Sequence, residues 1–469
     1  AAKFDQTRGL IQSADRVVLA ESIPAPKGSS YKYQREYPTH ALFGQITGVI
    51  SNRYGSYGVE DYYNSYLLSH NRPVKTLGDL LSTQTVTDTV TLTLSDTLQT
   101  VAMNALGGRD GAIVVLDPST GAIDAMYSNP SFDPSPLTSE ACVVPQTVGG
   151  KRKCAQTVAQ QAWGADTSLD SEGFRPLTSL AYQDATQFPP GSTFKIVTAS
   201  AAYEHAPQLV DAPMPYYTCI NGGTLGGQAP NKPLCNDPGT GNCGGTIAEM
   251  LPPSCDTGFA ILGTKVGAAS MTAEADAYGF NQQPPIDLPH SRNEEVSDFL
   301  QPSCDTTNAE IFLAQSSIGQ KCTDASPLQM AMVAAGIANK GVVMTPHVMS
   351  DIRDSQDNLV QTYKPTQWLR ATSPQTAAAI NTLMTEVVTS GTADGVGFPA
   401  SEDVAAKTGT AQIGLGNTGT TDWMIAFAPA SAPKVAVAVM IPNQTLYDYG
   451  APVAGPLVKT MIAAALGGQ

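Results

Sequence analysis

The chain has 469 residues, of which 42% are hydrophobic and 14% are charged. This composition is typical of a soluble globular protein, and the length is sufficient for two or three domains. The formal net charge of −15 argues against nucleic acid or an anionic membrane as the main partner. No run of about 18 apolar residues is evident, so we expect no segment that spans a bilayer. We expect no signal peptide in the first residues, which is consistent with removal of a targeting or anchoring segment.

The first 88 residues are rich in tyrosine and differ in composition from the rest of the chain. They predict short, irregular strands with one helix over residues 57–69. Residues 88–95 alternate between polar and apolar side chains, which predicts a strand. Residues 96–106 follow as an amphipathic helix with Asp96 at its start.

The second part of the chain predicts one sheet that is assembled from distant segments. Residues 111–128 form two apolar runs around the turn Asp-Pro-Ser-Thr-Gly, which is a strong hairpin signal. Residues 129–330 predict helices separated by long loops, and residues 451–466 predict a final helix. Three further strands are predicted near the end, over residues 402–413, 422–430 and 434–442. Strands at both ends with helices between them indicate an α+β fold, in which an antiparallel sheet is packed between helices.

Eight cysteines lie in the middle of the chain and none in its flanks, and they are Cys142, Cys154, Cys219, Cys235, Cys243, Cys255, Cys304 and Cys322. An even number in Pro/Gly/Asn-rich segments favours disulfides and an oxidising compartment over scattered free thiols. Cys142–Cys154 and Cys304–Cys322 are the easiest short loops to close, and the pairing of the other four cysteines stays open. No C-x-x-C pair and no Cys/His cluster with zinc spacing occurs, so we expect no metal and no cofactor.

Ser192 and Lys195 lie one helical turn apart at the start of an apolar segment, directly after Pro189, Pro190 and Gly191. Residues three apart on a helix are neighbours, so the hydroxyl and the amine could share a proton. Burial disfavours the charged form of a lysine, and a neutral amine could activate the serine. A capping serine beside a lysine whose amine reaches solvent is the alternative, because this short pattern decides nothing alone.

Two further short elements extend the pattern. Ser254 and Asp256 flank Cys255 in a predicted loop, and Lys407 precedes Thr408, Gly409 and Thr410 on a predicted strand. The order S-x-x-K, S-x-N and K-T-G is the signature of penicillin-binding proteins and serine β-lactamases. All three elements in this order, between the predicted hairpin and the paired strands, are hard to produce by chance.

At these residues the sequence resembles a class B penicillin-binding protein, most closely the actinobacterial A-type branch. Nearly the whole chain carries the resemblance, through QTRGLI, YGSYGVEDYYNSYL, VVLDPSTGAIDAM, PPGSTFK, SPLQMAMVAAGIANKG, VVTSGTA and AAKTGTAQ. The resemblance implies an N-terminal pedestal domain over residues 1–88 and a penicillin-binding transpeptidase domain, with a five-stranded antiparallel sheet, over residues 89–469. It also implies an extracytoplasmic position, anchored by an N-terminal membrane helix outside this chain.

The resemblance further implies a role for each motif residue in a serine D,D-transpeptidase that cross-links peptidoglycan. Ser192 would attack the penultimate D-Ala carbonyl of a stem peptide, with Lys195 as its base. Ser254 would relay a proton to the leaving amine. The family's oxyanion hole would use the backbone N–H groups of Ser192 and Thr410.

On the same basis, Lys407, Thr408 and Thr410 would hold the substrate carboxylate. Gly409 would leave room for the substrate backbone along the strand. The expected partners are stem peptides, β-lactam antibiotics and a membrane-embedded glycosyltransferase.

Asp256 departs from the family pattern, which has asparagine at this position. An amide offers two donors, whereas an ionised carboxylate offers none. Asp256 would face Lys195 and the carbonyl of the acyl side chain, where an unmade hydrogen bond costs roughly 1–3 kcal/mol. The carboxylate would also favour the charged form of Lys195 and oppose its role as a base. The hypothesis is a slow reaction with β-lactams, and a neutral variant with unchanged kinetics is the alternative.

Several readings stay open at the level of the sequence. Cys255 could be redox-sensitive, although a disulfide that fixes its loop is favoured. Asp422 and Trp423 could line the site or form a turn with a core tryptophan. The fold could also serve as a catalytically weak scaffold for a cell-wall glycosyltransferase, or belong to a β-lactam-hydrolysing or sensing relative. Intact Ser192 and Lys195 argue against the scaffold, and no obvious deacylating base supports a hydrolase.

Overall fold

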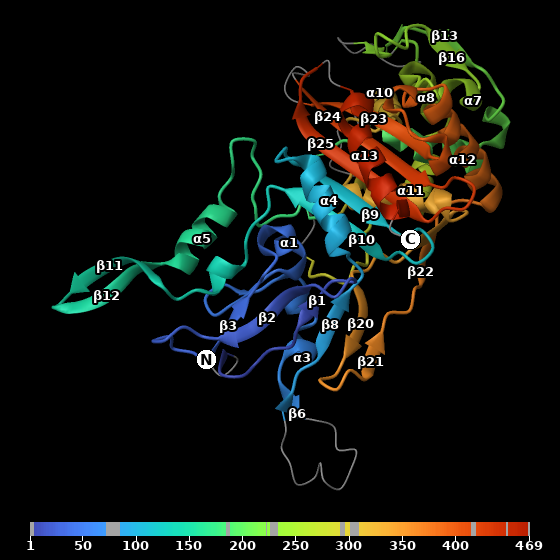
Figure 1. Ribbon diagram of the computed structural model, residues 1–469. Helices are drawn as coiled ribbons and strands as arrows, with labels where there is room; N and C mark the ends of the chain where they lie inside the picture. Colours follow the sequence, from blue (N-terminus) through green and yellow to red (C-terminus); the bar gives the residue numbers. More distant parts are fainter. Residues whose placement is uncertain are drawn as a thin grey trace.

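The computed structural model describes most of the chain, in two bodies joined by several chain crossings (Figure 1). The described residues are 4–71, 85–183, 188–221, 223–225, 233–290, 296–300, 309–413, 419–446 and 449–467.

The first body is built on a six-stranded sheet that combines the N-terminus with a later part of the chain. Its strands, in spatial order, are β21 (Leu359–Thr362), β20 (Met349–Arg353), β8 (Thr89–Leu92), β1 (Ile11–Gln12), β2 (Val18–Pro24) and β3 (Tyr33–Glu36). The predicted strand 88–95 is thus present as β8. The helix predicted over 57–69 is present as two short helices, α2 (Gly58–Tyr62) and α3 (Asn64–Leu67), and α1 (Gly44–Thr47) precedes them.

A buried ion-pair network fastens this body. Glu60 of α2 accepts from Arg35 Nε at 2.6 Å and from Arg8 Nε at 2.5 Å, and all three side chains are almost fully buried. Burial raises the pKa of Glu60, but the two guanidinium groups outweigh this and hold the pKa below its ordinary value. Removal of either arginine would leave a buried charge with less compensation.

The second body is a five-stranded antiparallel sheet, in the order β10 (Ile123–Asn129), β9 (Gly111–Leu116), β25 (Val435–Gln444), β24 (Gly419–Ala428) and β23 (Ala405–Ile413). Helices α4 (Asp96–Leu106) and α13 (Gly450–Gly467) pack on one face, and α11 (Pro327–Ala338) packs on the other (Figure 1). This arrangement confirms the predicted fold.

The sequence of strand β25 is apolar over residues 435–442, and the packing on its two faces explains this. Val437 and Val439 face the helices α4 and α13, whereas Ala436 and Ala438 belong to the core on the side of α11. Successive residues of a strand point to opposite faces, so a strand covered on both faces needs apolar residues at every position.

Helix α13 is long and apolar enough to cross a membrane by length and composition alone. It nevertheless lies against β23, β24 and β25, and Leu457, Val458, Met461 and Ile462 are buried in the core. Its apolar character follows from this packing.

Between the two groups of strands, the chain forms α5 (Val158–Thr167), α6 (Lys195–His205), α7 (Ile247–Met250), α8 (Asp256–Val266), α9 (Ala268–Ala277), α10 (Ala309–Ser316) and, after β22, α12 (Pro374–Thr389). The prediction of helices and loops here missed several hairpins. They are β11 (Cys142–Val148) with β12 (Lys151–Thr157), β13 (Met214–Tyr217) with β16 (Cys243–Gly245), and β14 (Cys219–Ile220) with β15 (Leu234–Cys235). Smaller pairs are β4 (Ile50–Ser51) with β5 (Gly55–Ser56), β6 (His70–Asn71) with β7 (Thr85–Val86), β17 (Asp298–Phe299) with β18 (Thr323–Asp324), and β19 (Val342–Met344) with β22 (Gln367–Arg370).

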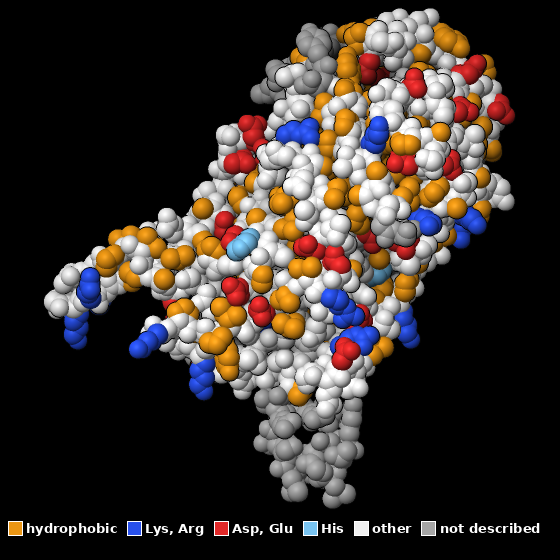
Figure 2. All heavy atoms as spheres, in the orientation of Figure 1, with side chains coloured by type: hydrophobic (Ala, Val, Ile, Leu, Met, Phe, Trp, Pro, Cys, Tyr) orange, Lys and Arg blue, Asp and Glu red, His pale blue; other side chains and the backbone are white. Residues whose placement is uncertain are grey.

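The hairpin of β11 and β12 projects from the body, and basic side chains lie at its tip (Figure 2). It turns at Gly149 and Gly150, both of which have positive φ, as two-residue hairpin turns require. The Cys142–Cys154 disulfide closes its base, which confirms that predicted pair.

Two more disulfides resolve the cysteines whose pairing the sequence left open. Cys219 pairs with Cys235, and Cys243 pairs with Cys255. The predicted Cys304–Cys322 pair involves Cys304, which lies outside the described residues.

Candidate active site

Ser192 lies in a 3₁₀ turn, η5 (Gly191–Phe194), that leads directly into α6. Gly191 has φ +54°, and a Cβ there would lie 2.8 Å from the carbonyl of Thr410. Glycine is therefore required because the turn presses against β23. Ser192 itself is half-buried, whereas Phe194 stacks on Phe299 in the core. The turn thus fixes the backbone while it leaves the Ser192 hydroxyl partly accessible.

Lys195 is fully buried, and all three donors of its ammonium group have acceptors. Nζ donates to the Ser254 carbonyl at 2.7 Å, to Ser254 Oγ at 3.2 Å and to Asp256 Oδ1 at 2.6 Å. Asp256 Oδ1 also lies 3.5 Å from Ser192 Oγ, a long contact. The structure therefore places a carboxylate between the two residues of the first motif.

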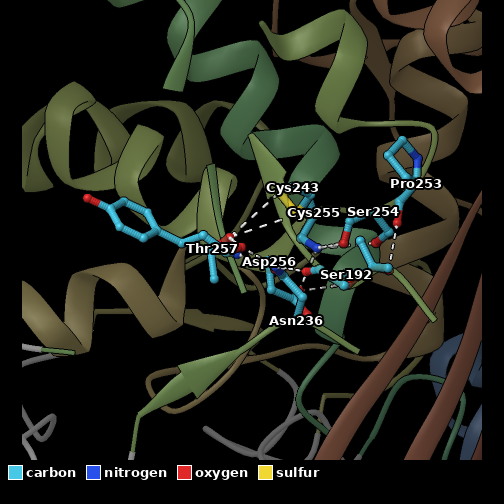
Figure 3. The surroundings of a disulfide bond; sticks show 12 residues. Ser192, Asn236, Cys243, Pro253, Ser254, Cys255, Asp256 and Thr257 are labelled. Carbon is cyan, nitrogen blue, oxygen red and sulfur yellow. Dashed lines mark hydrogen bonds and ion pairs between the residues drawn. A yellow bond between two sulfur atoms is a disulfide. The ribbon is translucent and has the colours of Figure 1, made fainter. Parts of the chain in front are cut away.

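Ser254 and Asp256 are presented by a constrained turn (Figure 3). Ser254 has φ +60°, a conformation that non-glycine residues rarely adopt, and Asp256 is the first residue of α8. The residue between them, Cys255, is buried and bonded to Cys243. We call this bond the motif disulfide. It ties the turn to β16 and supports the structural interpretation of Cys255.

Strand β23 brings the third motif to the same place. Lys407 is fully buried, and its Nζ donates to Ser254 Oγ at 2.8 Å and to the carbonyl of Thr408 at 3.0 Å. Ser254 Oγ thus accepts from both lysines. Thr408 is hydrogen-bonded through its hydroxyl to Thr392 at 2.6 Å, and Thr410 is half-buried. The three motifs therefore form one connected network.

The electrostatics of Lys407 follow from this crowding. Burial, together with the positive charge of Lys195, lowers the pKa of Lys407 well below its ordinary value, although Asp256 and Asp237 act in the opposite direction. An anion bound beside Lys407 would therefore favour its charged form.

The structure explains the glycine at position 409 by packing, whereas the sequence suggested that it leaves room for the substrate backbone. A Cβ at this position would lie 2.7 Å from the carbonyl of Pro190 and 2.9 Å from Thr193 Cγ2. The missing side chain thus lets β23 pack directly against the turn that carries Ser192. Trp423, opposite Gly409 on β24, is buried and donates from Nε1 to the carbonyl of Pro189 at 2.9 Å. Asp422 and Trp423 are therefore buried residues within β24 and do not form a turn before that strand.

Asp237 is a charged neighbour of the site that the sequence analysis missed. Its carboxylate interacts electrostatically with Asp256, Lys195 and Lys407. The preceding residue, Asn236, accepts at Oδ1 from the backbone N–H of Thr257 at 2.8 Å. The sequence feature that could have indicated Asp237 is its position between Cys235 and Cys243, each of which forms a disulfide with a different cysteine. Among the described residues, no cluster of His, Cys, Asp and Glu could hold a metal ion.

Comparisons with known proteins agree with this geometry. Residues 111–463 match the penicillin-binding protein transpeptidase domain, and residues 8–89 match the penicillin-binding protein A dimerisation domain. The chain therefore belongs to the penicillin-binding protein transpeptidase family.

Full-length relatives refine this assignment to the A-type branch. Peptidoglycan D,D-transpeptidase PbpA of Mycolicibacterium smegmatis is 32% identical over 99% of this chain and 90% of its own length. The ceftriaxone acyl-enzyme complex of penicillin-binding protein A from Mycobacterium tuberculosis has a TM-score of 0.83 at 30% identity, with 99% of both chains covered. A D,D-transpeptidase domain from Eggerthella lenta has a TM-score of 0.78 at 29% identity, again with 99% of both chains covered. The resemblance found in the sequence is thereby confirmed.

Proposed function

We propose that this protein is a serine D,D-transpeptidase that cross-links peptidoglycan stem peptides and is acylated by β-lactams. The observation that carries this proposal is the hydrogen-bonded network of Lys195, Ser254 and Lys407 beside the partly accessible hydroxyl of Ser192. Relatives named D,D-transpeptidases and related structures described as β-lactam acyl-enzymes support it. Because peptidoglycan lies outside the cytoplasmic membrane, the protein acts there.

In this proposal Ser192 Oγ attacks the penultimate D-Ala carbonyl, and the Lys195 amine accepts the hydroxyl proton. Lys195 must first lose one proton from its saturated ammonium group. Ser254 Oγ, which accepts from both lysines, is the natural relay to the leaving D-Ala amine. Lys407 supplies the positive charge for the substrate carboxylate, with the hydroxyl groups of Thr408 and Thr410 beside it.

The backbone N–H groups of Ser192 and Thr410 would form the oxyanion hole of this enzyme. The close packing of Gly191 against Thr410 supports their proximity. In other acyl-transfer enzymes, the loss of one such donor costs about 2.7–4 kcal/mol of transition-state stabilisation.

We further propose that acylation by β-lactams is slow because of Asp256. The carboxylate accepts from Lys195 at 2.6 Å, which favours the cation, and it offers no donor to the carbonyl of an acyl side chain. This feature also favours the second candidate, a catalytically weak scaffold for a cell-wall glycosyltransferase. A hydrolase or sensor lacks such a specific observation.

We also propose a domain arrangement, a membrane anchor and a partner for this enzyme. Residues 1–88 would form a pedestal, and residues 89–469 would form the catalytic domain, although its strands β8, β20 and β21 complete the sheet of the pedestal. An N-terminal membrane helix would be the anchor, and a membrane-embedded glycosyltransferase would be the partner. The match of residues 8–89 to a dimerisation domain supports a separate role for the N-terminal part.

Incubation with a thioester or depsipeptide analogue of the stem peptide tests the function. The wild-type protein should release the leaving group and form an adduct visible by intact mass, whereas Ser192→Ala should form none. Failure of the folded wild-type protein to react with the analogue and with penicillin would favour the scaffold. Rapid turnover of a chromogenic cephalosporin without a lasting adduct would favour a hydrolase.

A further inference from the structure

The loop that joins the two disulfides near the site carries an exposed carboxylate, Asp237, to which the reaction described above assigns no role. We call residues 235–243 the 237 loop. It begins at Cys235, bonded to Cys219, and ends at Cys243 in the motif disulfide. Both ends are thus covalently fixed, and the second is fixed to the motif turn itself.

Hydrogen bonds hold the same loop against the motif turn. Asn236 Oδ1 accepts from the N–H of Thr257, one residue after Asp256 (Figure 3). Asn236 Nδ2 donates to the carbonyls of Tyr217 and Gly241, both at 2.7 Å. A loop with this many fixed points places Asp237 in a defined position.

Asp237 faces the charges of the site. It interacts with Lys195 and Lys407, of opposite sign, and with Asp256, of like sign. The residue as a whole is exposed, although protein atoms crowd its carboxyl group. Among the described hydrogen bonds, Asp237 contributes its backbone carbonyl and no side-chain oxygen. Its carboxylate is therefore available to a ligand.

The two half-reactions of a transpeptidase differ in the groups they bring to the site. Acylation brings a carbonyl and a carboxylate, whereas the second half-reaction brings an amine, which is largely an ammonium at neutral pH. A carboxylate on the loop that packs against the motif turn suits an ammonium and repels an anion. We propose that Asp237 binds the cationic amine of the acyl acceptor and directs it to the acyl-enzyme. This inference rests on the proposed transpeptidase function and adds a substrate-binding residue to it.

The step is balanced with the groups present. The acceptor ammonium gives one proton to the Asp237 carboxylate, and the neutral amine nitrogen bonds to the acyl carbon. The ester bond to Ser192 Oγ breaks, and a second proton passes from nitrogen to Oγ. Asp237 then returns its proton to solvent. Desolvation and the charge of Asp256 raise the pKa of Asp237 above its ordinary value, although both lysines act against this, so Asp237 is a better proton acceptor than an isolated aspartate.

The test compares a cationic and a neutral acceptor on the same acyl-enzyme. The protein is acylated with a thioester substrate at pH 7.5, with either a lysine-ended tripeptide or hydroxylamine, which is mostly uncharged at that pH. Mass spectrometry gives the ratio of aminolysis to hydrolysis. We expect Asp237→Asn to lower this ratio by about fivefold for the tripeptide, the upper end of the effect of a partly exposed charge interaction. The hydroxylamine ratio should stay within about twofold, and both ratios are taken from the same acyl-enzyme, so neither depends on the acylation rate.

Control variants separate recognition from structure. Asp211→Asn removes an exposed carboxylate whose described charge neighbour is Tyr203, and it should change neither ratio. Asp237→Glu should restore part of the preference for the tripeptide. An unchanged tripeptide ratio in Asp237→Asn, or an equal loss with both acceptors, would overturn the assignment while acylation stayed intact. Absence of acylation in the wild-type protein would instead overturn the proposed function and this inference with it.

Discussion

Replacement of Asp256 by asparagine is the sharpest test of the proposed slow reaction with β-lactams. Asp256 Oδ1 accepts from Lys195 Nζ at 2.6 Å and lies 3.5 Å from Ser192 Oγ. An asparagine in the same rotamer keeps one acceptor for Lys195 and gains two donors. It also removes the negative charge that favours the lysine cation. Both changes should assist acylation.

The size of the effect follows from the contacts that change. One hydrogen bond made rather than missed at a buried site is worth roughly 1–3 kcal/mol. At 1.4 kcal/mol per decade, this predicts about ten- to a hundredfold faster acylation by penicillin. Asp256→Ala separates the two causes, because it removes the charge without adding a donor. A gain shared by both variants would identify the charge, and a gain confined to asparagine would identify the donor.

Intact mass, followed over hours with excess penicillin, measures the reaction directly. Adduct on Asp256→Asn should precede adduct on the wild-type protein, and Ser192→Ala should remain unmodified. Thermal unfolding of each variant checks the fold, because Asp256 is the first residue of α8, where a carboxylate favours the helix. Equal rates for Asp256→Asn and the wild-type protein would refute the reasoning and make Asp256 a neutral variant of the motif.

Three further outcomes are expected. Replacement of both Cys243 and Cys255 by serine should lower the free energy of unfolding by about 3 kcal/mol in denaturant and should slow acylation by penicillin. Replacement of both Cys142 and Cys154 by serine should leave the acylation rate unchanged. Gly409→Ala should reduce acylation at least tenfold, because its Cβ would lie 2.7 Å from the Pro190 carbonyl; unaltered kinetics would contradict this packing. Burial, with a smaller contribution from a nearby carboxylate, raises the pKa of Glu274 from 4.5 to about 9. The folded protein then holds a proton that the unfolded chain releases, so this stability is present below pH 4.5 and lost as pH rises to about 9. Glu274→Gln should therefore stabilise the protein increasingly between pH 5 and 9, by at most about 6 kcal/mol, and a pH-independent difference in melting temperature would contradict it.

Local sequence patterns predicted the sheet and the motif residues because each depends on neighbours in the chain. The apolar run of β25 and the turn after β9 are signals of this kind. The proximity of Asp256 to Lys195 followed from the family resemblance and is present at 2.6 Å.

Other features depend on contacts between distant residues, which one sequence does not encode in a readable pattern. The pairing of Ile352 with Val90 joins β20 to β8 in the six-stranded sheet, between two segments that lie far apart in the sequence. The pairing of Cys243 with Cys255 was one of several combinations that spacing allowed. Asp237 lacks any motif, and its relevance arises only because the two disulfides carry its loop to the lysines.

The two carboxylates have different consequences for the two kinds of acyl donor. In the proposed mechanism Asp256 would slow capture of any acyl donor, because its carboxylate accepts from Lys195 Nζ at 2.6 Å in stem-peptide and β-lactam reactions alike. Asp237 would assist only the step that brings the acceptor amine, and the β-lactam reaction stops at the acyl-enzyme, before any acceptor amine takes part. If both effects operate, Asp256 slows acylation by the antibiotic and by the stem peptide, and Asp237 accelerates only the second half-reaction of cross-linking. Asp237→Asn should then lower the rate of cross-linking relative to the rate of acylation by the antibiotic. Asp256→Asn should increase the rate of acylation by the antibiotic more than the overall rate of cross-linking.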